Sequence, residues 1–383
     1  MRFALLIVVF GLSFGSVSAS EPDRFSTAPV THDGAKWRIA YYEGGPYNSY
    51  EKSFIAIVNA LAELGWMEPA PGLSAMASNR KRWKWLARSA NSDYLEFVKD
   101  AFYSANWDET SRKELKARII QRLNESGDID LVMAMGTWAG RDLSNNRHST
   151  PVVAASISDP IGSGVIESQP DPRLAHIHTR VDLHRYEHQL EMFHDIVGFK
   201  TLGMVYENTD SGRTYAAIDT VHNVAKKRDF DVVTCRVTTG VDDIRVYESD
   251  VIECFRKLVK SVDALYVTRH AGVNPGTVPT LARIAIDHRI PTFSQAGAEE
   301  VAMGFLMSLS TAEPAAVGRF HAAAIARIFN GARPRELEMT FDTPKKIAIN
   351  LETAEKIGVD VTEALFRRAS RAFDRIESSQ LSE

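Results

Sequence analysis

Polar, glycine-bearing or aromatic loops directly follow six apolar runs of the sequence, and their residue types can bind small anions. Each loop offers hydroxyl groups, backbone N–H groups at the start of a helix, or an arginine, and such groups bind carboxylates. Arg213 and Arg269 could add a bidentate clamp. Turns and helix caps require the same residue types, so the recurrence of these loops, rather than any one of them, supports a binding site. The six loops are residues 43–50, 136–142, 156–164, 207–215, 268–277 and 295–300.

The first of these loops is rich in aromatic residues. The stretch IAYYEGGPYNSYEKSF, residues 39–54, holds four tyrosines, two glycines and a proline. We expect Tyr42, Tyr47 and Tyr50 to form a wall that stacks on a flat or apolar ligand, because aromatic rings supply contact area at low entropic cost. Gly44, Gly45 and Pro46 would let the backbone approach that ligand. Alternatively, Tyr42 and Tyr50 are structural and only Tyr47 reaches the ligand.

Catalytic motifs are absent from the sequence. It contains no P-loop, HExxH, CxxC or GxSxG, and no dinucleotide-binding glycine fingerprint follows the first apolar run. His184 and His188 lie at positions i and i+4 and could share a helix face in a zinc site, whereas the alternative is a solvent-facing histidine cluster. We therefore expect no catalytic residue, no metal and no cofactor, and we predict that the protein is not an enzyme.

Strands and helices must position the loops. Short, nearly continuous apolar runs predict strands covered on both faces, and the amphipathic segments between them predict helices. Their alternation predicts an α/β protein of two doubly wound parallel-sheet lobes joined by a hinge, with the ligand at the carboxyl ends of both sheets. The predicted strands are 37–42, 131–136, 151–156, 201–206, 230–237, 264–268 and 290–295. The predicted helices are 50–64, 110–125, 184–197, 213–228, 244–260 and 276–288.

The chain length indicates more than one core, because 383 residues exceed the size at which a single core stops growing. The proline- and glycine-rich segment 158–173 predicts a crossover between lobes. The predicted division is a secretory signal at 1–19, an N-terminal lobe of 36–160 plus 303–336 with an insertion at about 66–108, a C-terminal lobe of 161–302 plus 337–361, and a C-terminal helical tail at 362–383.

The insertion holds the basic segment NRKRWKWLARS, residues 79–89, and then YLEFV, which is a further candidate strand. We interpret the basic segment as a solvated helix whose tryptophans cover an adjacent face. The alternative is a docking surface built on Trp83 and Trp85.

The first 19 residues are typical of a secretory signal. Arg2 precedes an apolar run from Phe3 to about Phe14, and a small-residue cleavage pattern ends at Ala19. The run is shorter than the roughly 20 residues that span a bilayer. No cysteine lies near the cleavage site, so we expect a soluble periplasmic protein without a lipid anchor. A net charge of −4 argues against a nucleic-acid partner.

The two cysteines, Cys235 and Cys254, lie in a predicted strand and in the helix after it. An oxidising compartment permits a disulfide, and neighbouring elements can bring the two Cα atoms within the roughly 4.4–6.8 Å that a disulfide needs. The alternative is a pair of buried thiols that pack as small apolar groups.

The order of these pieces resembles that of the extracytoplasmic solute-binding proteins of ATP-binding-cassette (ABC) importers, in the family with the type I periplasmic-binding-protein fold that includes tryptophan and tyrosine binders. The most specific matches are SDPIGSG after a buried strand and the closing INLETAEKIG. The other matching segments are DIDLVMAMGTWAGRDL, KTLGMVYENTDSG, VDALYVTRHAGV and IPTFSQ.

The resemblance implies two hinged lobes that close over a small organic ligand and deliver it to an ABC permease in the inner membrane. We expect a monomer whose ligand is an amino acid or another carboxylate with an aromatic or apolar body. The alternative is a ligand-sensing periplasmic subunit for a membrane signalling partner. Relatives often carry a Pro-Thr-Asp-Asn-like turn where this chain has residues 268–271, and that difference changes the charge of the site. The candidate ligand contacts are Tyr42, Glu43, Tyr47, Ser49, Gly136, Thr137, Trp138, Ser158, Asp159, Asn208, Ser211, Arg213, Thr268, Arg269, His270 and Gln295.

Overall fold

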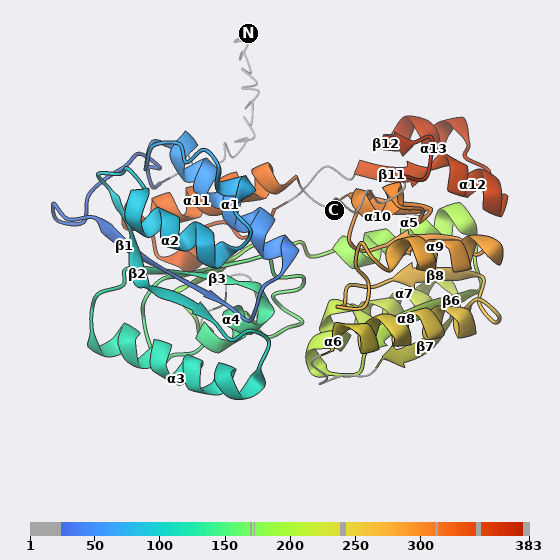
Figure 1. Cartoon of the computed structure of the whole chain (residues 1–383), viewed down its shortest axis with the longest axis horizontal. Coiled ribbons are helices and arrows are strands. Elements are labelled where there is room, and N and C mark those ends of the chain that lie inside the picture. The colour runs from blue at the N-terminus through green and yellow to red at the C-terminus, as the bar shows by residue number, and fades with distance from the viewer. Residues whose placement is uncertain are drawn as a thin grey trace, which may run out of the picture.

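The computed structural model of the protein describes residues 24–168, 171, 173–237, 243–310, 313–341 and 346–377. The predicted secretory signal and the last residues of the predicted tail, 378–383, lie outside these ranges. The described chain forms two α/β lobes, each built around one sheet (Figure 1). The α/β class and the two-lobed arrangement that the sequence predicts are therefore confirmed.

The first lobe contains five parallel strands in the order β2-β1-β3-β4-β5. Its strands are β1 (Trp37–Glu43), β2 (Leu95–Ser104), β3 (Leu131–Met135), β4 (Val152–Ala155) and β5 (Ile177–Thr179). Its helices are α1 (Asn48–Glu63), α2 (Asn79–Ser89), α3 (Glu109–Glu125), α4 (Gly136–Leu143) and α11 (Pro314–Phe329), with 3₁₀ turns η1 (Leu73–Ala75) and η2 (Pro334–Glu336).

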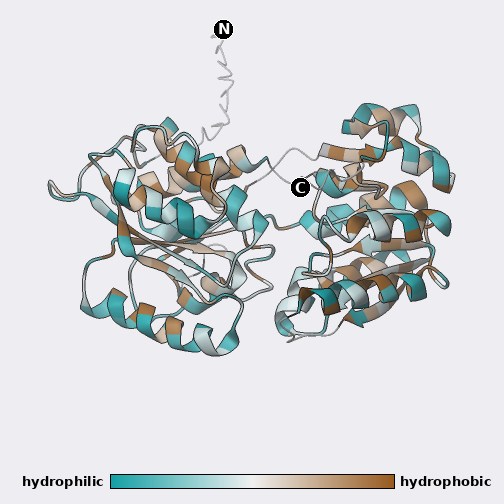
Figure 2. Ribbon diagram, in the orientation of Figure 1, coloured by the Kyte–Doolittle hydropathy of each residue, from teal (hydrophilic) through white to brown (hydrophobic). Residues whose placement is uncertain are grey.

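Helices cover both faces of this sheet, which is why its strands are apolar without alternation. Neighbouring strand residues point to opposite faces. Tyr41 packs into the cluster under α1, α2 and α11, whereas Tyr42 packs into the cluster under α3 and α4. The exterior helix α3 buries only Leu115, Ile119 and Ile120 and is mostly hydrophilic in Figure 2.

The second lobe contains seven strands in the order β12-β11-β10-β9-β8-β6-β7, which are parallel except for the antiparallel pair β10–β11. Its strands are β6 (Thr201–Glu207), β7 (Asp231–Val237), β8 (Ala264–Val267), β9 (Thr292–Ser294), β10 (Met307–Ser310), β11 (Lys346–Asn350) and β12 (Ala369–Phe373). Its helices are α5 (Arg185–Val197), α6 (Asp210–Tyr215), α7 (Ile218–Arg228), α8 (Ile244–Leu258), α9 (Val278–Asp287), α10 (Ala298–Ala302), α12 (Leu351–Ile357) and α13 (Glu363–Arg368).

One predicted helix, 213–228, is two helices in the structure. Ala217 has a φ of 53° and a ψ of 40°, and this left-handed residue ends α6 and starts α7 in a new direction. A left-handed alanine has no sequence signature, because the conformation is unfavourable for every residue with a Cβ atom. The break keeps α6 as a short separate element at the end of β6.

The two cysteines form a disulfide between β7 and α8, so the alternative of two free thiols is wrong. Their Cα atoms are 5.6 Å apart. The pairing links the edge strand of the second sheet to the helix that follows it in the chain.

The insertion is an integral part of the first lobe. Its candidate strand is confirmed as β2, which pairs with β1 at the sheet edge. Trp83 of α2 is fully buried, and its indole Nε1 donates a hydrogen bond to the Val98 carbonyl at 3.0 Å. Trp85 is partly buried against the same core. The tryptophans therefore cover an adjacent face, as the sequence indicated, and Trp83 offers no docking surface.

The predicted lobe boundaries need two corrections. Residues 161–168 and 173–181, which the sequence assigned to the C-terminal lobe, belong to the first lobe, because β5 pairs with β4 and Val165, Ile166 and Val181 lie in its core. Conversely, β10 was assigned to the N-terminal lobe but pairs with β9 in the second sheet. The rest of the 303–336 segment does return to the first lobe, where α11 packs on α1.

The predicted helical tail is also corrected. After the short helix α13, residues 369–373 form β12, which pairs in parallel with β11 and extends the second sheet. This strand is mostly exposed, so it lacks the apolar pattern from which strands are predicted.

The chain crosses between the lobes three times: after β5, after β10 and before β11. Two of the crossings are joined by backbone hydrogen bonds, from Val181 N–H to the Met339 carbonyl at 2.7 Å and from Phe341 N–H to the Val181 carbonyl at 3.1 Å. In the described ranges, no helix has the length and apolarity needed to cross a bilayer.

Candidate ligand-binding site

The loops at the carboxyl ends of both sheets meet where the lobes touch. Lys52 of α1 places its Nζ 2.5 Å from Oε1 of Glu299 on α10. The side chains of Thr137 on α4 and Tyr215 on α6 are hydrogen-bonded. These contacts set α1 and α4 of the first lobe opposite α6 and α10 of the second, and we call the region between them the interlobe site.

Two of the candidate residues at the end of β1 lie inside the first lobe. Tyr42 is fully buried and donates its hydroxyl hydrogen to Oδ2 of Asp142 at 2.7 Å. Glu43 is also buried and accepts a hydrogen bond from the Tyr41 hydroxyl at 2.6 Å, and burial raises the pKa of its carboxyl. Neither side chain reaches the interlobe site, so the expected tyrosine wall cannot include Tyr42.

An aromatic cluster does face the interlobe site at the start of α1. Tyr47 is 43% exposed, and its ring lies 5.2 Å from the ring of buried Tyr50. Trp107 extends the cluster, with its ring 6.1 Å from Tyr50 and 5.4 Å from Trp138. Tyr42 and Tyr50 are therefore core residues, as the alternative expected, and a ligand contact of Tyr47 stays a prediction.

The two glycines of the aromatic loop accommodate Trp107. A Cβ atom on Gly45 would lie 2.6 Å from the Trp107 ring, and one on Gly44 would lie 3.0 Å from the same ring. The Trp107 Nε1 donates a hydrogen bond to the Pro46 carbonyl at 3.0 Å. A tryptophan about 60 residues further along the chain thus occupies the space beside these glycines, and the expected approach of their backbone to the ligand stays a prediction.

Two residues at the start of α4, Gly136 and Trp138, are fixed by side chains from other helices. Gly136 has a φ of +82°, and the Tyr50 hydroxyl occupies the position of the Cβ atom that it lacks. Trp138 lies under the guanidinium of Arg112, 4.4 Å from the ring centre. Arg112 is in turn fixed by Asp142, so the network that buries Tyr42 also orients Trp138.

The remaining candidates of the first lobe have separate roles. The Ser49 and Ser156 hydroxyls are 2.8 Å apart, and Ser158 accepts a hydrogen bond through its carbonyl from the Tyr186 hydroxyl of the second lobe at 3.4 Å. Asp159 caps its own turn, since its Oδ1 accepts from the Gly162 N–H at 2.8 Å. Ser49 and Ser158 therefore border the interlobe site, whereas Asp159 has a local structural partner.

In the second lobe, the loop after β6 and helix α6 hold three candidates. Asn208 is exposed, and Ser211 is hydrogen-bonded to Tyr215. Arg213 is 43% exposed and lies 3.7 Å from Asp219, so its guanidinium is available to a ligand at little cost. Tyr215 was inside a quoted loop but was not selected from the sequence.

Thr268 and Gln295 are scaffold residues. Thr268 is buried and donates its hydroxyl hydrogen to the Val205 carbonyl at 2.5 Å. Gln295 is fully buried, accepts from the Arg269 N–H at 3.2 Å and donates to the Ala216 carbonyl at 3.3 Å. Their contacts hold the loops after β6, β8 and β9 together.

His270 and Arg269 have unsatisfied groups. Both ring nitrogens of His270 and the Nε of Arg269 are buried and have no hydrogen-bond partner among the described residues. Burial lowers the pKa of His270 to about 4, so the ring is neutral at pH 7. Neutral imidazole can both donate and accept, so His270 can serve a polar ligand group.

Glu300 of α10 gives the site a pH-dependent component. Burial raises its pKa to about 7 from the ordinary 4.5, against the opposing effects of the Ser294 hydroxyl and the Arg269 charge. Since the folded-state pKa lies above the unfolded value, the stability that Glu300 contributes is complete below about pH 4.5 and is lost as the pH rises through about 7.

We predict that Glu300→Gln raises the free energy of unfolding relative to wild type. The difference should grow as the pH rises from 4.5 to 7 and reach on the order of 1–3 kcal/mol at pH 8. The amide retains an acceptor for the Ser294 hydroxyl and removes the buried charge. Urea unfolding of both proteins across this pH range measures the difference. Glu299→Gln, at the exposed neighbouring carboxylate, is the control, and a pH-independent difference for Glu300→Gln would contradict the prediction.

Three contributors to the site were missed from the sequence: Trp107, Tyr215 and Glu207. Burial raises the pKa of the Glu207 carboxyl, which accepts a hydrogen bond from the Ala271 N–H. Glu207 is the last residue of β6, and its position at a strand end was a usable signal. Trp107 had none, because it adopts a left-handed φ of 64° in a turn of the insertion.

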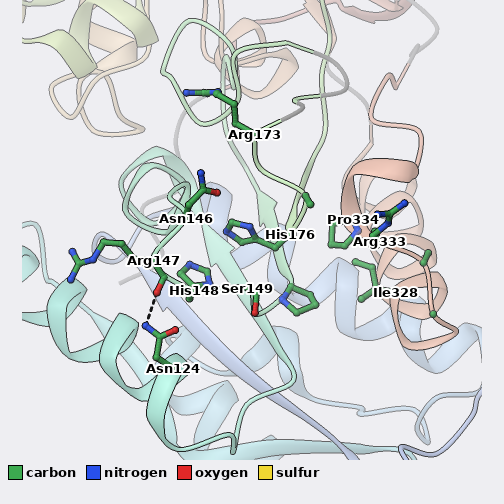
Figure 3. Close-up of a pocket in the computed structure, with 14 residues that line it drawn as sticks. Asn124, Asn146, Arg147, His148, Ser149, Arg173, His176, Ile328, Arg333 and Pro334 are labelled. Carbon is green, nitrogen blue, oxygen red and sulfur yellow. Dashed lines mark hydrogen bonds between the residues drawn. The ribbon is translucent and has the colours of Figure 1, made fainter.

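A separate cavity of about 680 Å³ lies at the opposite end of the first sheet (Figure 3). Pro151 and His176, which line it, directly precede β4 and β5, so the cavity is at the amino ends of these strands. The arginines Arg173 and Arg333 in its wall are ion-paired, with Asp171 and Glu336 among their partners. This cavity therefore contains none of the candidate loops.

No group of three or more side chains suited to a metal ion occurs in the described part of the chain. The Nδ1 of His184 lies 3.2 Å from Glu187, and the rings of His184 and His188 are 5.7 Å apart. The pair lies at the start of α5, where the described contacts of His184 are with an acidic side chain.

Comparisons with known proteins find relatives over most of the chain. The family described as ABC transporter substrate binding protein matches residues 96–373. A tyrosine-binding protein of Clostridioides difficile strain R20291 is 23% identical over 195 residues, which are 51% of this chain and 52% of that protein. The match thus spans about half the length of this curated relative.

Solved structures share the two-lobed fold. A conserved domain protein of Vibrio cholerae has a TM-score of 0.65 at 16% identity, covering 88% of this chain and 99% of that one. An ABC domain from Streptococcus pneumoniae in complex with L-Trp has a TM-score of 0.64 at 18% identity, covering 88% and 100%. A ligand-free, open substrate-binding protein of Clostridium difficile has a TM-score of 0.59 at 18% identity, also covering 88% and 100%.

Proposed function

Because the chain belongs to the family of ABC transporter substrate-binding proteins, we propose that it captures a small organic ligand in the interlobe site and delivers it to an ABC permease. Members of this family are substrate-binding proteins rather than enzymes. The observation that supports the proposal is the exposed Tyr47 at the N-cap of α1, the helix whose Lys52 contacts Glu299 of the second lobe. Closure of two hinged lobes is an established way to enclose such a ligand.

The ligand that we propose is an amino acid or another carboxylate with an aromatic or apolar body. Tyr47, Trp107 and Trp138 provide ring surface, and Arg213 and Arg269 provide cationic groups. The relatives that bind tyrosine and L-Trp support this class. Contacts from Ser49, Thr137, Ser158, Ser211 and His270 would complete the site.

We propose a periplasmic, monomeric protein that is released after cleavage at Ala19. The sensing alternative relied on a docking surface that included Trp83, and Trp83 is buried in the first lobe. We therefore propose that the protein binds its ligand for transport rather than for signalling.

Native mass spectrometry of residues 20–383, purified gently from an exporting host, tests the proposal. A bound small mass that is lost on denaturation would support a binding protein and identify the ligand. Thermal unfolding with amino acids and organic acids is the second readout, since a ligand at 100 times its dissociation constant stabilises by about 2.7 kcal/mol. A protein that carries no mass and responds to no compound would contradict the proposal.

We predict that Tyr47→Ala weakens binding of the identified ligand by about 10- to 100-fold, because it removes an aromatic contact of about 1–3 kcal/mol. Stability should change little, since the side chain is 43% exposed. Isothermal titration calorimetry measures the affinity. Phe366→Ala, an aromatic residue that is 49% exposed on α13, is the matched control, and equal affinities of the two variants would exclude Tyr47 from the site.

A further inference from the structure

Three arginines lie near the point where the chain passes from β5 of the first lobe to α5 of the second. Arg180 follows β5, Arg185 is the first residue of α5, and Arg269 follows β8. Arg185 Nη2 donates to the Gln295 carbonyl at 3.2 Å, and Arg269 Nη2 donates to the adjacent Ala296 carbonyl at 3.1 Å. The guanidinium of Arg180 lies 5.8 Å from the Phe341 ring at the crossing between the lobes.

Arg185 is buried, and Arg180 and Arg269 are half-buried. Arg185 is 8% exposed, and its Nε, like that of Arg269, is buried without a hydrogen-bond partner in the described ranges. Burial and the neighbouring Arg185 and Arg269 charges lower the pKa of Arg180 to about 10. Burial likewise lowers the pKa of Arg185, and the Arg269 charge lowers it further. The three charges are therefore close enough to repel one another.

No carboxylate of the described chain lies within 4.0 Å of any of the three guanidinium groups. The acidic groups that act on them are Asp182 and Glu300. Asp182 is exposed, and Glu300 accepts a hydrogen bond from the Ser294 hydroxyl at 2.6 Å. In contrast, Arg173 and Arg333 of the first-lobe cavity are ion-paired.

A buried guanidinium without a counter-charge is costly, and a bound anion removes that cost. Guanidinium groups also match the planar oxygens of carboxylates and phosphates. We propose that Arg180, Arg185 and Arg269 form an anion subsite of the interlobe site, and that the ligand is a small organic dianion rather than a zwitterionic amino acid. This inference rests on the proposed function, whose ligand it specifies.

The charge balance of the interlobe site supports a dianion. Three guanidinium groups converge on the hinge side, and Arg213 adds a fourth cation on α6. The carboxyls at the site, Glu207 and Glu300, are half-buried and both have raised pKa values, which weakens them as partners for an ammonium group. One carboxylate from a zwitterion would leave most of the arginine charge unbalanced.

Sulfate binding tests the subsite without requiring the natural ligand. Isothermal titration calorimetry at constant ionic strength should give saturable sulfate binding to wild type. The Arg180→Gln and Arg269→Gln variants should bind about tenfold more weakly or worse, as expected when a charge-assisted contact is lost. Arg118→Gln, an exposed arginine of α3, is the control and should bind as wild type does. Equal binding by all four proteins, or none by wild type, would overturn the proposal.

Folding of the variants does not limit this test. Removing Arg180 relieves repulsion, so thermal unfolding without sulfate should be unchanged or higher in Arg180→Gln. Added sulfate should then stabilise wild type and Arg118→Gln more than Arg180→Gln. Because sulfate also stabilises proteins non-specifically, only the difference between variants counts, and the absence of a difference would contradict the subsite.

Competition with organic compounds identifies the anion. Isophthalate and phenyl phosphate, both dianions, should displace sulfate, and their relative affinities distinguish a dicarboxylate from a phosphate ligand. Isophthalamide and L-tyrosine should not displace it. If L-tyrosine binds wild type and Arg180→Gln equally and sulfate does not bind, the proposed function stands and this inference falls. Arginine-dependent sulfate binding without any organic ligand would uphold the subsite and count against the proposed function.

Discussion

Replacing Asp142 by alanine is expected to destabilise the protein by about 3–5 kcal/mol, because it leaves the half-buried Arg112 without its buried partner. Asp142 is 3% exposed and accepts two hydrogen bonds from Arg112, at 2.9 and 3.1 Å. It also accepts one from Tyr42 and lies 3.4 Å from the Lys116 Nζ. Removing the carboxylate therefore leaves three donors unsatisfied, two of them charged.

Urea unfolding measures this loss, and Glu109→Ala is its matched control. Glu109 contacts the same Arg112 at 3.3 Å but is 61% exposed, so its removal should cost at most about 1 kcal/mol. Arg112 also covers Trp138, so Asp142→Ala should weaken ligand binding as well. Similar stabilities of the two variants would show that burial of the Asp142 pair contributes nothing.

Replacing Gly136 by alanine is expected to cost about 2–5 kcal/mol, through backbone strain and overpacking together. With a φ of +82°, the residue lies in the left-handed region, where a Cβ atom is unfavourable. The new Cβ would lie 1.8 Å from the Tyr50 hydroxyl, and Tyr50 is only 5% exposed, so the ring has little room to move.

Gly34→Ala separates the two causes, because Gly34 has nearly the same φ of +84° and no atom within 4 Å of the added Cβ. The free energy of unfolding of Gly34→Ala should fall only by the cost of the backbone strain, about 1 kcal/mol. Thermal or urea unfolding of both variants gives the comparison. Equal losses would mean that the Tyr50 ring yields to the added methyl group at no cost.

Much of the fold could be predicted because its signals are local. A strand buried on both faces must be apolar throughout, and β3, with residues LVMAM, is fully buried. Helix caps are equally local: Asp108 accepts from the Ser111 N–H at 2.7 Å to begin α3. The elements and the α/β class therefore follow from short segments read one at a time.

Lobe boundaries were less predictable because strand pairing is not local. The three residues of β5, Ile177–Thr179, are too few to show a pattern, and only the hydrogen bonds to β4 assign them to the first sheet. The exposed β12 was missed for the opposite reason, since its stability comes from pairing with β11 rather than from burial.

The candidate site shows the same division. Its loops could be located from the sequence because ligand sites of α/β sheets lie at strand ends. Which side chains face the interlobe site could not, because Tyr41 and Tyr42 are neighbours of the same type and packing from distant helices buries both. Trp107 reaches the aromatic cluster only because β2 pairs with β1.

By itself, the sequence determined the α/β class, most of the elements and the loops that follow the strands, since periodicity and turn chemistry act over a few residues. The tertiary structure alone decided that Tyr42 is a core residue, that Cys235 and Cys254 are bonded, and that Arg180, Arg185 and Arg269 converge. Those outcomes depend on contacts between segments tens of residues apart, and the free energy of such contacts comes from burial and pairing that no single segment encodes.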